Sequence, residues 1–365
     1  MQATYWDYLK LDGLLSLQDG LEGTGDVALT DELHFIVVHQ VYELWFKLIL
    51  RSLRDARDAL AAPRVAEESI PSVVHHIRRV TAILRLGVQH WDVVETLAPQ
   101  DFLAFRDKLS PASGFQSFQM REFEILMGMD EADRIQYGKV APLEHLLDPK
   151  HAATPGGRLV HERITAARAE GSLLGALNEW LYRTPIQGST PNDPADARTV
   201  ARWVDEYLER HEGHLSEGFD KLAAAMGPNV DVTARFQDVK TAARAFLAGE
   251  GVAPEERPRV IRVRAAALFI ESYRSLPLLA WPRLLIDLIV EMEGSVVLWR
   301  HRHARMVERV IGRRVGTGGS GGVDYLDKTA SYRIFRDLWA VRTVLLPRER
   351  LPKLANPGLY GFSAD

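Results

Sequence analysis

The sequence predicts an all-α fold, a large helical bundle domain that follows a short amino-terminal arm. Apolar residues recur at steps of three and four along most of the 365 residues, and no stretch alternates as paired strands do. With 46% hydrophobic residues, the chain can bury a large core. The turn-rich breaks at 190–194 and 249–254 are too short for linkers. We therefore expect an arm over residues 1–29 and one catalytic domain over 30–365.

The first long helix is expected over 31–61, with acidic residues in its first turn and an apolar face that includes Phe35, His39 and Tyr42. A second helix should cover about 70–96 and a shorter one 101–109. A turn at 110–114 then precedes a helix that ends near 126. The remaining helices are expected at 156–168, 173–182, 194–225, 232–247, 257–274, 283–312 and 325–341.

Composition excludes several classes of protein. The formal net charge of -4, with acidic and basic residues interspersed, gives no basic field for nucleic acid. The absence of cysteine excludes disulfides, thiolate-bound haem and cysteine-bound clusters, so any metal must use His, Asp or Glu. The amino terminus lacks a secretory signal, and the longest apolar region, 276–290, is too short and too polar to span a bilayer. We expect a soluble cytoplasmic protein that binds neither nucleic acid nor membrane.

A histidine lies on the apolar stripe of the helix expected at 283–312. Val296, Trp299, His303, Met306 and Val310 share one helical face. A buried neutral imidazole is a natural axial ligand for iron, and the five glycines that follow let backbone amides approach a small molecule closely. A core histidine is the plainer interpretation. The glycines also fit G-x-G-x-x-G, but a helix rather than a strand precedes them, so a dinucleotide site is rejected.

Other side chains admit both a functional and a structural interpretation. His39 is a hydrogen-bond acceptor or base in an aromatic pocket, or a core histidine bonded to a carbonyl. Arg106 follows Phe102 and Phe105, and it either grips a carboxylate or extends over the rings to solvent. The arm aromatics are a lid over a planar ligand or a surface anchor. The HEGHLSE motif at 211–217 has histidines three apart, which is more typical of a solvated helix face than of a metal site.

Four segments, in order, resemble the tryptophan 2,3-dioxygenase family. They are TYWDYLKLDGLL, DELHFIVVHQVYELWFKLIL, FRDKLSPASGFQS, and LWRHRHARMVERVIG followed by GTGGSGG, within a match from residue 4 to about 353. The resemblance implies a cytoplasmic, all-helical homotetramer with one haem b per subunit between its helices. It also implies that both atoms of O2 are inserted into L-tryptophan to give N-formyl-L-kynurenine, the first step of tryptophan degradation by the kynurenine pathway.

The resemblance also implies residue roles. His303 corresponds to the axial ligand of the haem iron, whereas His301 falls off the apolar stripe. Phe35 matches the ring that packs on the indole, and His39 the histidine that accepts a hydrogen bond from the indole nitrogen and serves as the catalytic residue. The further substrate contacts implied are Arg106 for the carboxylate, Thr317 for the amino acid's backbone groups, Phe102, Ser113 and Gly114, and, from the arm of a neighbouring subunit, Tyr5, Tyr8 and Leu9.

Three departures from the family pattern leave alternatives open. His34 stands where an apolar residue is usual, His301 where an aromatic residue is common, and the loop reads GTGGSGG where GTGGSSG is usual. They are neutral, or they tune the site for a substituted tryptophan or another indole, with one oxygen atom transferred in secondary metabolism. A non-enzymatic haem sensor is the third reading, although it would not need the carboxylate grip of Arg106.

Overall fold

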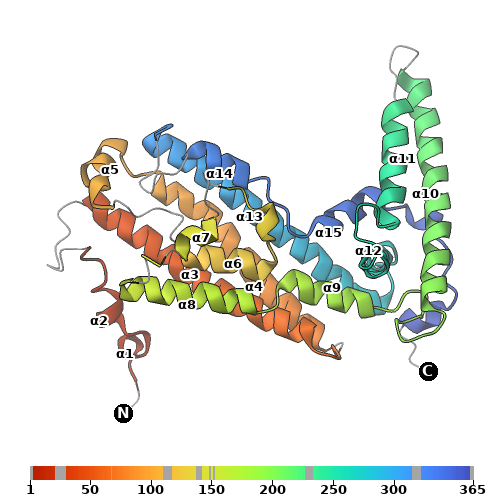
Figure 1. The fold of residues 1–365 in the computed structure, drawn as a ribbon, viewed down its shortest axis with the longest axis horizontal. Helices are drawn as coiled ribbons and strands as arrows, with labels where there is room; N and C mark the ends of the chain where they lie inside the picture. Colours follow the sequence, from red (N-terminus) through yellow and green to blue (C-terminus); the bar gives the residue numbers. More distant parts are fainter. Residues whose placement is uncertain are drawn as a thin grey trace. The chain divides into compact units, whose positions relative to one another are not determined.

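The computed structural model describes residues 3–20, 30–66, 68–109, 117–136, 142–147, 149–150, 153–226, 233–314 and 322–361. Within these ranges the chain is helical and has no β-strand beyond an isolated bridge between Ile186 and Ser189 (Figure 1). The predicted all-α fold class is confirmed.

The chain divides into two compact units. Unit 1 comprises residues 1–54, 78–172 and 292–332, and unit 2 comprises residues 55–77, 173–291 and 333–365. Three long helices contribute residues to both units: α3 (Thr30–Ala61), α4 (Ser69–Val94) and α13 (Ala280–Ile311). The expected single domain after residue 29 stays a prediction.

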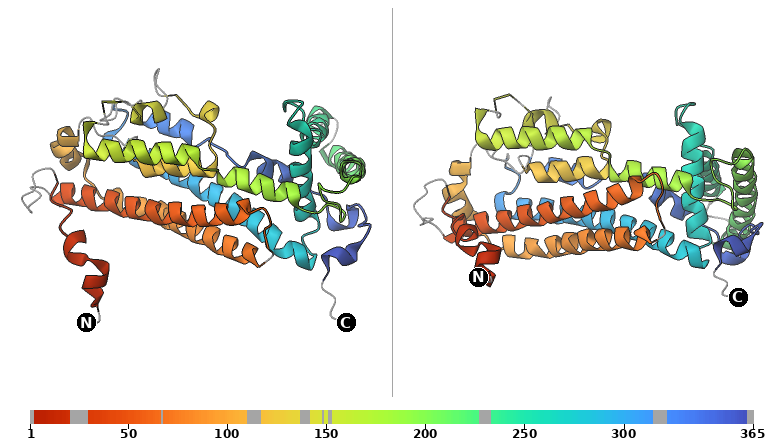
Figure 2. Two further views of the ribbon diagram at one scale, coloured as in Figure 1. Left: turned by 60° about the horizontal axis from the view of Figure 1, so that its bottom comes forward. Right: turned by 90° about the horizontal axis from the view of Figure 1, so that it is seen from below.

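Unit 1 is built on the parts of α3, α4 and α13 that belong to it. Helices α3 and α4 run side by side (Figure 2), and the Tyr42 hydroxyl of α3 donates to the Gly87 carbonyl of α4 at 2.7 Å. The other helices of this unit are α5 (Pro99–Phe105), which continues as a 3-10 turn (Arg106–Leu109), α6 (Phe118–Met127), α7 (Pro142–Leu146), α8 (Pro155–Ala169) and α14 (Val323–Thr329).

Local chemistry sets the ends of these helices. Helix α3 has Asp31 and Glu32 in its first turn, where carboxylates stabilise the positive end of the helix dipole. The Ser117 hydroxyl caps α6 by accepting from the Met120 amide. Gly128, with φ of 110°, ends α6 in a backbone conformation that favours glycine. The expected helices at 31–61 and 70–96 are confirmed to within two residues at each end.

The amino-terminal arm contains two short helices, α1 (Tyr5–Leu9) and α2 (Leu11–Leu14), with no buried residue. It extends away from the helices of unit 1 in the left view of Figure 2. Gln40 of α3 holds the end of the arm, since its amide donates to the Leu17 carbonyl at 2.8 Å. The aromatic side chains of the arm are therefore left in solvent in a single chain.

Helix α3 is the one helix in the described ranges that is long and apolar enough to cross a membrane, and only 28% of its most apolar 18-residue window is buried. One such helix is weak evidence, because core helices pass the same test, and α3 also carries His39 and Glu43 on a cavity wall. Large apolar side chains along α3 are nevertheless exposed, namely Leu33, Val37, Leu44 and Leu48.

Unit 2 is centred on α12 (Arg257–Ser272), whose residues 265–270 are fully buried. Helices α10 (Asp196–Met226) and α11 (Thr233–Leu247) form an antiparallel pair (Figure 1), with the rings of Phe219 and Phe236 5.0 Å apart. Helix α9 (Leu173–Arg183) packs on α12, as does α15 (Arg336–Val341).

The continuous helix expected at 325–341 is wrong. The chain forms α14 over Val323–Thr329 and, after a break, α15 over Arg336–Val341. The Thr329 hydroxyl donates to the Leu326 carbonyl and the Ser331 hydroxyl to the Lys328 carbonyl, each at 2.7 Å. Such side-chain bonds satisfy the last carbonyls of α14 and compete with continuation of the helix.

Candidate active site

A cavity of about 220 Å³ lies within unit 1, walled by α3, α4, α5, α6, α13 and α14. Its wall is mainly aromatic and apolar, and a few charged or titratable groups converge on it, as is common for small-molecule sites. The aromatic lining residues are Tyr42, Phe46, Trp91, Phe102, Trp299 and Tyr325, and the titratable ones include His39, Glu43, Arg106, Arg121, Arg300 and His303.

The imidazole of His303 lines this cavity. Its ring stacks in parallel on Trp91, with centroids 4.8 Å apart and 5° between the planes. Among the described residues, neither ring nitrogen has a hydrogen-bond partner. Burial lowers the pKa of His303 to about 3, and the charge of Arg300 acts in the same direction. The ring is therefore neutral at physiological pH, and one nitrogen keeps a lone pair.

His39 offers a hydrogen-bond acceptor to the same cavity. Its Nδ1 lies 2.7 Å from the Phe35 carbonyl oxygen, which can only accept, so Nδ1 carries the proton. Burial lowers the pKa of His39, although the bond to Phe35 partly opposes this. The side chain of His39 is accessible from the cavity, although protein atoms surround the residue closely enough to desolvate it. In the neutral ring, Nε2 is then the acceptor.

Aromatic rings pack next to His39. The Phe35 ring lies 4.0 Å from the His39 ring and 5.9 Å from the Phe102 ring, measured between centroids. Phe102 lines the cavity, whereas Phe35 is outside its described lining. Arg106, in the turn directly after α5, is half-buried and also lines the cavity. Four of the residues singled out from the sequence, His39, Phe102, Arg106 and His303, thus share one cavity.

Several other expected site residues are not brought to this cavity. The side chains of Tyr5, Tyr8 and Leu9 are 71%, 80% and 42% exposed in the single chain. Ser113, Gly114, Thr317 and the rest of the glycine-rich loop up to 321 lie outside the described residues.

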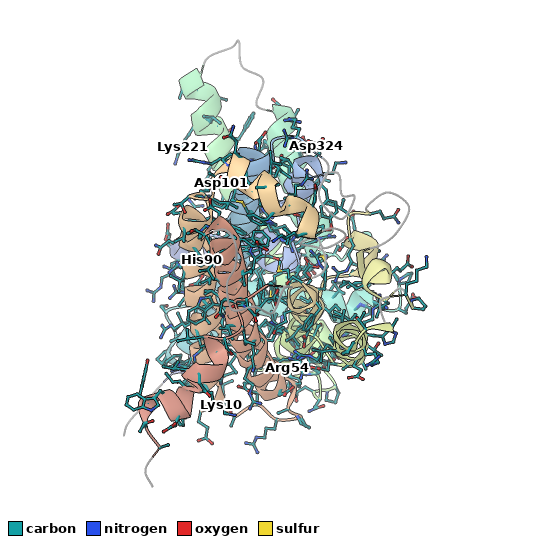
Figure 3. All side chains as sticks on the ribbon, turned by 90° about the vertical axis from the view of Figure 1, so that its left-hand side faces the viewer. Lys10, Arg54, His90, Asp101, Lys221 and Asp324 are labelled. Carbon is teal, nitrogen blue, oxygen red and sulfur yellow. The ribbon has the colours of Figure 1, made fainter. Side chains whose placement is uncertain are left out.

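The two histidines that depart from the family pattern also lie off the cavity. His34 Nε2 is 3.1 Å from the Val93 carbonyl, and His90 Nε2 of α4, labelled in Figure 3, is 3.2 Å from the Val38 carbonyl. These bonds join α3 to α4. His301 is exposed, as its position off the apolar stripe of α13 predicts.

In the HEGHLSE motif of unit 2, the side chains bind protein groups. Burial lowers the pKa of His211, which also hydrogen-bonds to the backbone of Thr343. Glu212 pairs with Lys240 and Arg244, and Glu217 with Arg350. Among the described residues, no group of three His, Asp or Glu side chains is placed to hold a metal ion.

Sequence reasoning missed a buried ionic cluster in the cavity wall. Glu124 of α6 receives Arg121 at 2.8 Å, Arg134 at 2.5 Å and Arg300 of α13 at 2.5 Å. Burial alone would raise the pKa of Glu124, but the three guanidinium groups lower it to about 2. The only signal in the sequence was a run of charges, Arg121 to Glu124, inside an otherwise apolar helix.

A larger cavity, of about 780 Å³, lies in unit 2 and includes Trp180, Arg183 and Trp281 in its lining. No histidine is among its described lining residues. The Arg183 guanidinium is occupied by the carbonyls of Leu60, Ala62 and Pro63, at 2.6 to 3.0 Å for the three residues. The cavity in unit 1, by contrast, is lined by His39 and His303.

Known proteins resemble this chain over almost its whole length. The family model for tryptophan 2,3-dioxygenase matches residues 1–345. A tryptophan 2,3-dioxygenase of Sorangium cellulosum is 45% identical over 99% of this chain and 88% of its own length. Tryptophan 2,3-dioxygenase 2 of Ralstonia nicotianae is 44% identical over 99% of this chain and 98% of its own.

These matches identify the all-helical chain as an oxidoreductase. The chain belongs to the tryptophan 2,3-dioxygenase family.

Proposed function

We propose that this chain is a haem-dependent dioxygenase that inserts both atoms of O2 into the indole ring of L-tryptophan. The product would be N-formyl-L-kynurenine, and the reaction the first step of tryptophan degradation. The observation that carries the proposal is the pairing of two neutral imidazoles on one cavity. Within the part of the chain that the structure describes, His303 has no hydrogen bond, and His39 offers an acceptor nitrogen.

The residues present fit a haem b group. His303 has the chemistry of an axial ligand, because its ring is neutral and no described residue forms a hydrogen bond with it. Trp91 fixes the plane of the imidazole by stacking on it, and the aromatic wall suits an apolar macrocycle. When bound, ferrous haem would supply the binding and activation of dioxygen.

The other residues would hold the substrate. His39 Nε2 accepts a hydrogen bond from the indole N–H, and this bond sets the orientation of the indole. Phe102 and Phe35 form the aromatic surroundings of the indole. Arg106, half-buried on the cavity wall, pairs with the substrate carboxylate. Because both oxygen atoms end in the product, no external reductant is consumed in a turnover. The substrate contacts assigned to Ser113, Gly114 and Thr317 remain part of the proposal.

We further propose a cytoplasmic homotetramer in which the arm completes a neighbouring subunit's site. The exposed Tyr5, Tyr8 and Leu9 and the exposed apolar side chains along α3 support this, since such surface is usually covered in an assembly. Sedimentation equilibrium tests it. A monomer at micromolar concentration would contradict it.

The decisive test of activity is the product formed from L-tryptophan and isotopically labelled O2 by the reduced, haem-loaded protein. N-formylkynurenine with two labelled oxygens is expected. One labelled oxygen, or turnover of another indole only, would favour the related monooxygenase instead. Haem binding without any turnover would favour a sensor.

A further inference from the structure

The indole of Trp91 is stacked on the imidazole of His303. Trp91 belongs to α4 and His303 to α13, and the planes of the two rings are parallel to within 5°, with centroids 4.8 Å apart. Both side chains line the cavity of unit 1, and Trp91 is only 3% exposed. The other described ring contact of His303, with Trp299, is inclined by 43° at 5.3 Å. Trp91 therefore presents its ring face to the imidazole, whereas Trp299 does not.

The position of Trp91 is set by packing and not by a hydrogen bond. Its Nε1–H is buried and has no partner among the described residues. A buried indole N–H usually finds an acceptor, and to leave it unpaired is destabilising. The ring instead contacts Tyr42 of α3 and Trp299 of α13, at 4.9 and 5.3 Å between centroids, as well as His303. These aromatic contacts are what the indole gains in this position.

Gly87, one turn before Trp91 in α4, lets the neighbouring rings approach. A Cβ atom added at Gly87 would lie 3.3 Å from Trp299 Cδ1 and 3.4 Å from Tyr42 Cε1, at the tight limit of ordinary contact. The Tyr42 hydroxyl also donates to the Gly87 carbonyl at 2.7 Å. Glycine within a helix is destabilising, but here it leaves room for two aromatic side chains. Residues of α3, α4 and α13 thus hold the Trp91 ring in place.

A stacked indole face affects an imidazole that binds iron. The π system of an indole is negative at its face, and it attracts positive charge within about 6 Å of the ring centroid. An imidazole bound to iron takes up part of the charge of the metal, and it takes up more from ferric than from ferrous iron. The contact of Trp91 with His303, at 4.8 Å, lies within that range. Its burial strengthens the attraction, because little water screens the charge.

We propose that Trp91 is a positioning residue for the axial histidine and favours ferric over ferrous haem. The proposal rests on the proposed function, which makes His303 the axial ligand. The parallel stack fixes the rotation of the imidazole, and the indole face stabilises the more positive imidazole of the ferric state. Trp91 thereby lowers the reduction potential of the haem without contacting the iron.

The test measures the reduction potential of the haem-loaded protein and its affinities for ferric and ferrous haem. Trp91→Leu should lower the ratio of ferric to ferrous affinity about threefold to tenfold, which is within the range of buried cation–π contacts. This change corresponds to a rise of about 30 to 60 mV in the reduction potential. Trp91→Phe keeps an aromatic face and should show a smaller rise.

Trp299→Leu is the matched control, because it removes a second indole near His303 that is inclined to the imidazole. This variant should leave the ratio of affinities unchanged. A shift as large as that of Trp91→Leu would overturn the proposal. A loss of affinity in Trp91→Leu that is equal in both oxidation states would also overturn it, since Trp91 would then only support the fold. If Trp91→Leu fails to fold, Trp91→Phe decides, and the absence of any rise in it would contradict the proposal.

The failure of this proposal can be told apart from the failure of the proposed function. A His303→Ala variant that keeps the haem spectrum of the unaltered protein would remove the axial ligand, and both proposals would fall. An unchanged potential in Trp91→Leu, in a protein that binds haem through His303, would overturn the role of Trp91 alone.

Discussion

The buried ion pairs of units 1 and 2 differ in charge balance. In unit 2, Arg262 meets Asp196 at 3.1 Å, one guanidinium to one carboxylate, and both side chains are less than a tenth exposed. In unit 1, three guanidinium groups share Glu124. The Arg262 guanidinium also donates to the Thr184 and Ser189 carbonyls, whereas Arg121 and Arg300 of the unit 1 cluster line a cavity. The comparison teaches that one buried carboxylate can serve several guanidinium groups, so that its loss should cost more stability than the loss of a carboxylate in a one-to-one pair.

The buried histidines show the same contrast. Burial lowers the pKa of both His211 in unit 2 and His303 in unit 1. His211 hydrogen-bonds to the backbone of Thr343, whereas His303 has no hydrogen bond among the described residues. A lowered pKa is therefore found both in a structural histidine and in a candidate ligand. The hydrogen bond to the ring, present in His211, distinguishes the structural histidine.

Removal of the shared carboxylate should have the largest effect. Glu124→Gln removes the carboxylate that three buried guanidinium groups share and should cost at least about 3 to 5 kcal/mol in the free energy of unfolding. Asp196→Asn, which leaves one such group in unit 2, should cost less. Urea unfolding of both variants measures the difference. A loss for Asp196→Asn as large as that for Glu124→Gln would break the comparison.

The pH dependence of stability sharpens the same point. The three guanidinium groups lower the pKa of Glu124 to about 2 in the folded chain, from its ordinary value of 4.5. Its stabilising contribution is thus complete above pH 4.5 and is lost as the pH falls from there to about 2. Across this window the unaltered protein should lose its advantage over Glu124→Gln. A constant difference between the two stability profiles would contradict the role given to Glu124.

Arg106→Leu should impair turnover of tryptophan about a hundredfold, chiefly through KM, because the substrate carboxylate loses its ionic partner on the cavity wall. Tryptamine, which lacks the carboxylate, provides the control, since any slow turnover or binding of it should change little. Steady-state kinetics and binding titrations measure both. An equal loss for tryptamine would show that Arg106 supports the fold rather than the substrate.

His39→Ala should lower kcat/KM about tenfold, the worth of one hydrogen bond, without abolishing turnover. The ratio between the unaltered protein and the variant should shrink for 1-methyltryptophan, whose indole nitrogen has no proton to donate. Complete loss of activity with haem retained would instead make His39 an obligatory base.

Helical periodicity made most of the fold predictable, because side chains that recur at steps of three and four report directly on a buried face. The break between α14 and α15 was missed, since it depends on the hydroxyl bonds of Thr329 and Ser331 rather than on hydrophobic pattern.

In the site, two residues could be singled out from the sequence. His303 lies on the apolar face of α13, and Arg106 directly follows two phenylalanines. The cluster of Glu124 was not foreseeable, because Arg300 lies 176 residues away in sequence and meets it only through tertiary packing.

The most direct test of the central claim, that the cavity of unit 1 holds haem through His303, is a haem titration of His303→Ala and His301→Ala followed by Soret absorbance. His301→Ala, altered at an exposed residue of the same helix, should bind one haem per chain as the unaltered protein does. His303→Ala should lose at least about a hundredfold in affinity, since even indirect partners of a metal are worth tenfold to a hundredfold. Unchanged affinity and an unchanged ferrous spectrum in His303→Ala would contradict the claim.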